Sequence, residues 1–182
     1  MPKKASPTST QTLRRQARKH LEQGAVTAGY SADRAAVLDR LHAALATELV
    51  CVMRYRRHFF MARGIHARGV AEEFLAHSNE ELAHADRLAT RMVQLGGEPD
   101  FDPAELVGRS HAQYAAGTSL VDMIRENLIA ERIAIDSYRG FVQFLGSEDP
   151  TTSELLKSIL AMEEEHADDL ADLLQDLPGA HD

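Results

Sequence analysis

The sequence has a single cysteine, no tryptophan and few other aromatic residues. Cys51 cannot form a disulfide within the chain, and the apolar helical run around it predicts a small buried side chain. Aromatic residues make up only 5% of the chain, whereas 44% is hydrophobic, a balance that favours an all-α fold over a β-sandwich. No run of 18 apolar residues and no charged-then-apolar leader occurs, so we expect a cytoplasmic protein that makes no contact with a membrane.

The charge is unevenly distributed along the chain. The net charge is −8, but residues 1–23 carry six basic side chains and one acidic side chain. The basic residues are Lys3, Lys4, Arg14, Arg15, Arg18 and Lys19. Such an arm is either a solvated tail or a contact for the phosphates of DNA. We therefore expect a basic, partly flexible arm over residues 1–30 with a possible short helix at 11–23, a folded body over 31–177 and a tail at 178–182.

Four long segments carry apolar residues at steps of three and four, the spacing of amphipathic helices. They cover about residues 32–63, 70–95, 120–145 and 150–177, with Ser119 as the expected N-cap of the third and Pro150 as the first residue of the fourth. The link between the second and third segments has room for a short helix at 103–115. Neither helical hairpin would bury its apolar stripe alone, so the pattern predicts a four-helix bundle with one long crossover.

A carboxylate followed three residues later by an imidazole occurs twice. The pairs are Glu81 with His84 and Glu163 with His166, each on one face of its helix and about one turn apart. Each pair has the spacing needed to bind one metal ion.

The other two long segments each present an isolated acid among apolar residues, Glu48 and Glu131. A buried charge there costs several kcal/mol unless it is paired or bound to a cation. The separations from Glu48 to Glu81 and from Glu131 to Glu163 are 33 and 32 residues, which indicates the same hairpin geometry twice. A tyrosine follows each isolated acid by seven residues, so we expect Tyr55 and Tyr138 to hydrogen-bond a ligand carboxylate across the bundle.

The six candidate ligands comprise four carboxylates and two imidazoles. They are Glu48, Glu81, His84, Glu131, Glu163 and His166. Their total charge of −4 would balance two divalent cations, and oxygen with imidazole suits iron, with manganese possible. By symmetry, Glu48 with His84 would hold one ion and Glu131 with His166 the other, with Glu81 and Glu163 as bridges. We expect such a pair of ions to support oxidation of Fe(II) by O₂ or H₂O₂.

Simpler interpretations stand beside this one. The acids could form surface salt bridges on a plain bundle. Four histidines, His58, His66, His77 and His111, have no evident ligand partner at helical spacing and are read as surface or hydrogen-bonded core residues. Six nearby acids are read as a solvated face, although some could gather iron at an inner cavity; these are Glu80, Glu164, Glu165, Asp168, Asp169 and Asp172.

The order of the six candidate ligands, with the phrases EELAHAD and EEEHADD, resembles bacterioferritin and the wider ferritin-like superfamily over about residues 31–175. This resemblance implies a ferroxidase diiron centre and a hollow homo-oligomeric shell that stores ferric mineral. The bacterioferritin haem ligand is a methionine that follows the second-helix glutamate. Leu82 stands there in this sequence, so no haem is expected.

Only 16 residues follow His166, too few for the fifth helix of ferritins. A short helix in the crossover without a fifth helix is similar to the Dps proteins, dodecameric mini-ferritins that protect DNA. The chain is thus similar to the Dps-like group with a bacterioferritin-type site within each subunit, although Cys51 alone does not supply the cysteine pair of that group. A dodecamer is favoured over a 24-mer.

Three functions remain open from the sequence. The first is a cage that oxidises and stores iron. The second is a diiron or dimanganese peroxidase or catalase-like enzyme without a cage. The third is a DNA-binding protective protein with a secondary metal site, for which the basic arm is the support.

Overall fold

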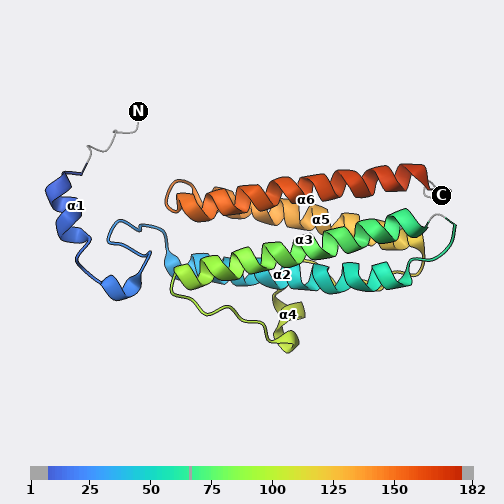
Figure 1. The fold of residues 1–182 in the computed structure, drawn as a ribbon, viewed down its shortest axis with the longest axis horizontal. Coiled ribbons are helices and arrows are strands. Elements are labelled where there is room, and N and C mark those ends of the chain that lie inside the picture. The colour runs from blue at the N-terminus through green and yellow to red at the C-terminus, as the bar shows by residue number, and fades with distance from the viewer. Residues whose placement is uncertain (1–7, 66, 178–182) are drawn as a thin grey trace.

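The protein is a four-helix bundle in the computed structural model, which describes residues 8–65 and 67–177. The long helices are α2 (Arg34–Met61), α3 (Ala67–Gln94), α5 (Leu120–Leu145) and α6 (Pro150–Asp176). They lie side by side along their whole lengths (Figure 1). The all-α bundle with a long crossover is confirmed, and in the described part of the chain no further helix follows α6. None of the described helices is long and apolar enough to cross a membrane.

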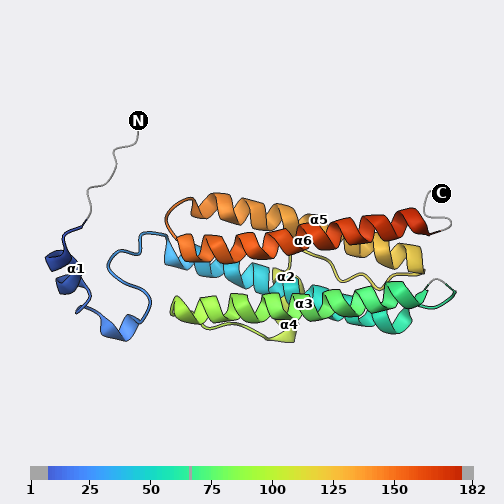
Figure 2. The same ribbon diagram turned by 45° about the horizontal axis from the view of Figure 1, so that its top comes forward.

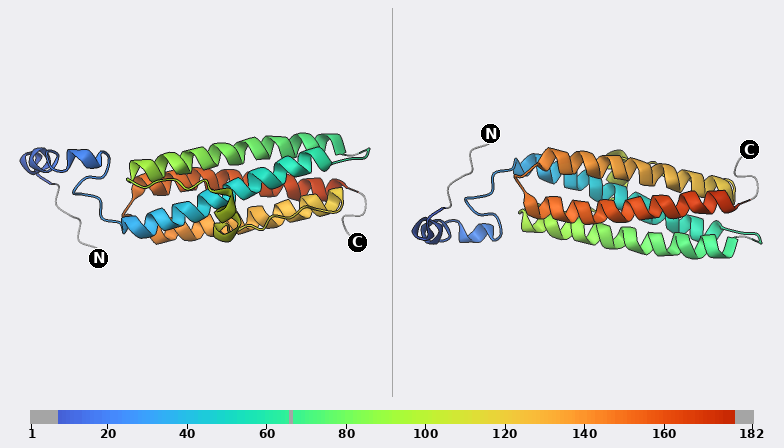
Figure 3. Two further views of the ribbon diagram at one scale, coloured as in Figure 1. Left: turned by 90° about the horizontal axis from the view of Figure 1, so that it is seen from below. Right: turned by 90° about the horizontal axis from the view of Figure 1, so that it is seen from above.

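The bundle consists of two helical hairpins. One contains α2 and α3, the other α5 and α6, and Figure 2 shows the second pair stacked on the first. The crossover runs back along the bundle from the end of α3 to the start of α5, and its short helix α4 (Pro103–Arg109) lies across α2 (Figure 3). All four long helices therefore present one face to a common interior.

Three side chains cap the long helices at their N-termini. The side chains of Asp33, Ser119 and Asp149 accept the backbone N–H groups three residues on, at 3.2, 3.2 and 2.9 Å. Ser119 is the N-cap that the sequence predicted, and Pro150 is the first residue of α6, where its missing N–H leaves no broken bond.

Both short helices are shorter than predicted. The expected helix at 11–23 is divided into α1 (Thr10–Gln16) and a 3₁₀ turn at Leu21–Gln23, because His20 adopts a left-handed conformation with φ 53°. Helix α4 ends at Arg109, six residues before the expected boundary, where the backbone becomes extended at Ser110. Figure 1 shows α1 projecting beyond the end of the bundle, away from its core.

Two apolar clusters fill the bundle interior. The cluster near the start of α2 includes Leu41, Leu45, Leu88, Phe141 and Ile159. The cluster at the other end includes Tyr55, Phe74, Ile124 and Leu170. The stretch between them on each long helix carries buried carboxylates and imidazoles. The apolar clusters thus exclude water from both ends of a polar centre.

A buried ion pair joins the two hairpins at the end where α6 begins. Arg91 Nη2 on α3 donates to both oxygens of Asp149 at 2.9 and 3.1 Å, and Tyr30 Oη and Thr152 Oγ1 also donate to Asp149. Burial opposes ionisation of Asp149, but these donors hold the pKa of its carboxyl below the usual value. Burial and the Asp149 carboxylate raise the pKa of Tyr30 to about 12.

Candidate metal centre

The six candidate ligands lie together at mid-length of the bundle. Glu48 is on α2, Glu81 and His84 are on α3, Glu131 is on α5, and Glu163 and His166 are on α6. All six residues are at most 2% exposed. The structure brings together every side chain that the spacing had selected, while their role as ligands stays a prediction.

The imidazole of His84 faces three carboxylates. Its Nδ1 lies 3.0 Å from Glu163 Oε1, 3.2 Å from Glu81 Oε2 and 3.5 Å from Glu48 Oε2. One ligand atom from each of these four residues falls within 4.8 Å of the others. This cluster contains the donors for one ion.

A second cluster of four shares two members with the first. Glu131 and His166 join Glu81 and Glu163, again with all ligand atoms within 4.8 Å of one another. His166 also points its Nδ1 inward, 3.7 Å from Glu81 Oε1. The two clusters therefore meet at Glu81 and Glu163, as two ions bridged by two carboxylates would require.

Besides Glu163 Oε1, which lies 3.0 Å from His84 Nδ1, three polar atoms in the second cluster are buried without a hydrogen-bond partner. They are Glu81 Oε1, Glu131 Oε2 and His166 Nδ1. A buried polar group without a partner costs about 1–3 kcal/mol, so such atoms are rare in folded proteins. Carboxylate and imidazole donors are suited to Fe or Mn, and a bound cation would satisfy all three.

Two tyrosines connect the hairpins through the isolated acids. Tyr138 on α5 donates its hydroxyl proton to Glu48 on α2, and Tyr55 on α2 donates to Glu131 on α5. Both phenols are buried. Each carboxylate is thereby fixed in orientation by a donor from the opposite hairpin.

Electrostatic repulsion shapes the protonation of the centre. Burial, with repulsion from Glu48 and Glu131, raises the pKa of Glu81 well above its usual value. Burial and the neighbouring carboxylates raise the pKa of Glu163 in the same way. Burial opposes a charge on His84, but hydrogen bonds with Glu163 and Glu48 raise its pKa to about 9. Without a cation, the centre thus retains protons that a cation would displace.

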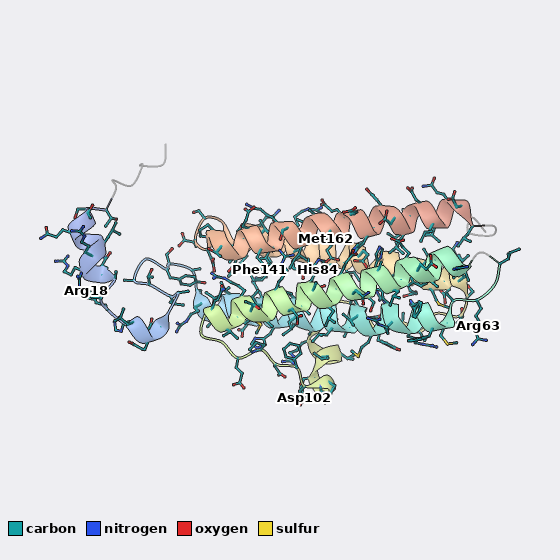
Figure 4. All side chains as sticks on the ribbon, viewed as in Figure 1. Arg18, Arg63, His84, Asp102, Phe141 and Met162 are labelled. Carbon is teal, nitrogen blue, oxygen red and sulfur yellow. The ribbon has the colours of Figure 1, made fainter. Side chains whose placement is uncertain are left out.

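The outward ring nitrogens of the two ligand histidines have different partners. His84 Nε2 contacts Met162 Sδ at 3.5 Å, and Figure 4 shows both residues between α3 and α6. His166 Nε2 lies 2.8 Å from Glu80 Oε2. The interpretation of Glu80 as part of a solvated face is therefore incomplete, because its carboxylate, although 43% exposed, orients a buried imidazole.

The interpretation of His77 as lacking a ligand partner at helical spacing is wrong. Glu73 precedes it by one turn of α3, and His77 Nε2 lies 3.2 Å from Glu73 Oε1 and 3.8 Å from Asp169 Oδ2. Burial and the neighbouring His166 lower the pKa of His77 to about 3. The four-residue spacing of Glu73, His77 and Glu81 is the signal in the sequence that could have indicated this cluster.

Three other residues fulfil structural roles. His58 is a hydrogen-bonded core residue, with Asn127 Nδ2 and the Ala115 carbonyl oxygen each 3.0 Å from its ring nitrogens. His111 is exposed and bonds Ser137. His66 lies outside the described residues. Cys51 is buried as predicted, and burial raises its pKa, so it stays a thiol.

A buried guanidinium was not predicted from the sequence. Arg54 is 2% exposed and donates to Asn127 Oδ1 at 2.9 Å and to the Gln113 carbonyl oxygen at 2.8 Å. It fixes the crossover to α2 near the second apolar cluster. No short-range pattern marks this role, because its acceptors are distant in sequence.

Comparisons with known proteins agree with this geometry. A family model described as "Ferritin-like domain" matches residues 38–180. The chain is 28% identical over 140 residues to the bacterioferritin BfrA of Mycobacterium tuberculosis, covering 76% of this chain and 84% of the relative. It is 28% identical over 151 residues to a DNA protection during starvation protein of Pyrococcus furiosus, with 80% of each covered.

Among solved structures, the dodecameric thioferritin of Bacteroides fragilis, described as bacterioferritin-related, superposes with a TM-score of 0.76 at 34% identity. The match covers 79% of this chain and 87% of the other. The structure of BfrA from M. tuberculosis gives 0.68 at 26% identity, covering 77% and 83%.

Proposed function

The chain belongs to the ferritin-like family, and from this premise we propose that it is a ferroxidase that stores iron in a homo-oligomeric cage. Its substrate is Fe(II), its oxidant is O₂ or H₂O₂, and its product is ferric mineral. The observation that carries the proposal is the pair of four-residue clusters that share Glu81 and Glu163. Such an arrangement provides two adjacent cation positions in a dry interior.

The side chains of the centre have separate tasks in this proposal. Glu48 with His84 and Glu131 with His166 would hold the two ions, and Glu81 and Glu163, which belong to both clusters, would be shared between them. Two adjacent iron ions supply the two electrons that reduce O₂ or H₂O₂ without release of radicals.

The chain also handles the protons and fixes the end ligands. Glu81, Glu163 and His84 release their protons as cations enter, which neutralises the centre without importing anions. Tyr55 and Tyr138 keep the isolated carboxylates in place by hydrogen bonds across the bundle. These bonds reduce the reorganisation required when iron binds.

Stopped-flow oxidation of two Fe(II) per chain tests the ligand set. Glu81→Ala or His166→Ala should abolish the rapid phase while circular dichroism still reports a helical bundle. Glu165→Ala, an exposed acid on the same helix as His166, is the matched control and should oxidise Fe(II) as the wild type does. Unchanged kinetics in Glu81→Ala would contradict the assignment.

The assembly is proposed to be a dodecamer, in line with the thioferritin of B. fragilis. Twelve chains of 20.1 kDa give about 240 kDa, which light scattering measures directly on a sample of known iron content. A mass of twenty-four chains would instead indicate a larger ferritin cage. A dimer would exclude storage and favour a diiron or dimanganese peroxidase or catalase-like enzyme.

Protection of DNA is a second candidate because the N-terminal arm carries exposed cationic side chains. Arg14, Arg15 and Arg18 are exposed on or beside α1, which projects from the bundle (Figure 1). The body of the chain is acidic and repels the duplex, so binding should require the arm. Deletion of residues 1–23 should abolish the retardation of DNA in gel electrophoresis at low salt. Full retention of DNA binding by the deletion variant would exclude the arm as the DNA contact.

A further inference from the structure

A second group of potential ligands lies on the solvent side of the candidate centre, between α3 and α6. It consists of Glu73 and His77 on α3 and Asp169 on α6, with one donor atom of each within 4.8 Å of the others. The His77 side chain is only 2% exposed, whereas those of Glu73 and Asp169 are 39% and 48% exposed. A buried imidazole thus faces two carboxylates that solvent can reach.

The hydrogen bonds of Tyr55 determine which nitrogen of a neutral His77 carries the proton. The Tyr55 hydroxyl donates its proton to Glu131, so its oxygen can only accept from His77 Nδ1, which lies 3.3 Å away. Nδ1 of the neutral ring is therefore protonated, and the lone pair is on Nε2. That atom is buried and has no hydrogen-bond partner.

Three atoms with lone pairs consequently converge at one point. His77 Nε2 lies 3.2 Å from Glu73 Oε1 and 3.8 Å from Asp169 Oδ2. Oxygen or nitrogen ligands at about 2.0–2.2 Å from a common ion lie roughly 3–3.5 Å from each other, so small movements of two exposed carboxylates suffice. Without a bound ion, the two carboxylates would repel each other and would offer His77 Nε2 no hydrogen-bond donor.

We propose that Glu73, His77 and Asp169 form a third site for a divalent transition-metal ion, separate from the six-residue centre. The donor set is one imidazole and two carboxylates, which suits Fe(II), Mn(II), Co(II) or Zn(II). Water would complete the coordination on the open side. The site exists whether or not the buried centre oxidises iron.

The proposed site adjoins the buried centre. The His77 ring is stacked on that of His166, with 4.0 Å between centroids and 21° between planes. Glu80 extends the group, because its carboxylate falls within 4.8 Å of donor atoms of both His77 and His166. An ion held by Glu73 and Asp169 would therefore sit on the solvent side of a ligand of the buried centre.

Equilibrium binding of Co(II) to the metal-stripped full-length protein tests the proposal. Calorimetry and visible absorption should report three ions per chain for the wild type and two for Glu73→Gln or Asp169→Asn. Loss of a hydrogen bond to a metal ligand typically lowers metal affinity by roughly 10- to 100-fold. Loss of a direct ligand should therefore weaken binding at the third site by more than this. Both substituted carboxylates are partly exposed, so the variants should fold.

Matched controls are Glu72→Gln and Asp168→Asn, exposed neighbours that should retain all three ions. If the buried centre failed to bind Co(II), the number of ions per chain would be one in the wild type and zero in Glu73→Gln or Asp169→Asn, instead of three and two. The proposed third site and the proposed function of the buried centre are therefore tested separately. Equal counts and affinities in wild type, Glu73→Gln and Asp169→Asn would overturn the third site. That result would leave His77 Nε2 buried without a partner.

Discussion

The metal-free protein should lose stability as the pH rises from 6.5 to 8.5, and the raised pKa of His84 is one cause. Its pKa is about 9 in the folded chain, because Glu163 and Glu48 both face the proton on Nδ1 and outweigh the effect of burial, against about 6.5 for an unfolded histidine. The folded state therefore binds more protons in this interval. The stabilisation is fully present below pH 6.5 and is lost as the pH approaches 9.

The size of the effect follows from the shift in pKa. A shift from 6.5 to about 9, at 1.36 kcal/mol for each unit, corresponds to about 3 kcal/mol of unfolding free energy. Glu81 and Glu163 act in the same direction, since their pKa values are also raised. His77 and His58 have lowered pKa values and act in the opposite direction, but only below pH 6.5.

Urea denaturation of the chelator-treated protein at constant chain concentration measures this slope. His84→Gln should remove the histidine contribution and leave the part due to Glu81 and Glu163. Saturation with Co(II) should reverse the slope, because the cations displace the same protons. An unfolding free energy that stays constant or rises between pH 6.5 and 8.5 in the metal-free wild type would refute this reasoning.

Three further outcomes are expected. Tyr55→Phe should slow rapid Fe(II) oxidation about tenfold in stopped-flow experiments, because Glu131 loses the donor that orients it. Asp149→Ala should lower the unfolding free energy by about 3–5 kcal/mol in denaturant titrations, because Arg91 is left buried without its partner. Addition of haem should give no methionine-ligated absorption spectrum, because Leu82 has no ligand atom.

Local signals in the sequence predicted the helices and the six converging side chains. Apolar spacing determines which face of each helix is buried, and an acid three residues before a histidine fixes two donors on that face. Ser119 and Pro150 marked helix starts for the same local reason. The boundary at His20 was missed, because a left-handed residue other than glycine leaves little trace in a single sequence.

Contacts between hairpins explain what the sequence did not predict. Glu73 and His77 are one turn apart on α3, but Asp169 approaches them from α6, and only the packing of the two helices brings it there. Arg54 likewise depends on Asn127 and the crossover carbonyl of Gln113. Helical periodicity describes neighbours on one helix and cannot specify which residues of another helix face them.

Hydrogen-bond partners are unevenly distributed among the helices of the centre, so a bound metal ion should affect some helix contacts more than others. Glu48 and Glu131 each have a tyrosine donor from the opposite hairpin, so α2 and α5 are joined at the centre before any ion arrives. On α3 and α6, Glu81 Oε1 and His166 Nδ1 lack hydrogen-bond partners, and they face each other across the two hairpins. Cations would add links between these two helices, which the contacts of His166 with Glu80 and of His84 with Glu163 already connect, while the apolar clusters hold the bundle at both ends. Metal loading should therefore stabilise the α3–α6 contact more than the α2–α5 contact, and hydrogen exchange along these helices would resolve the difference.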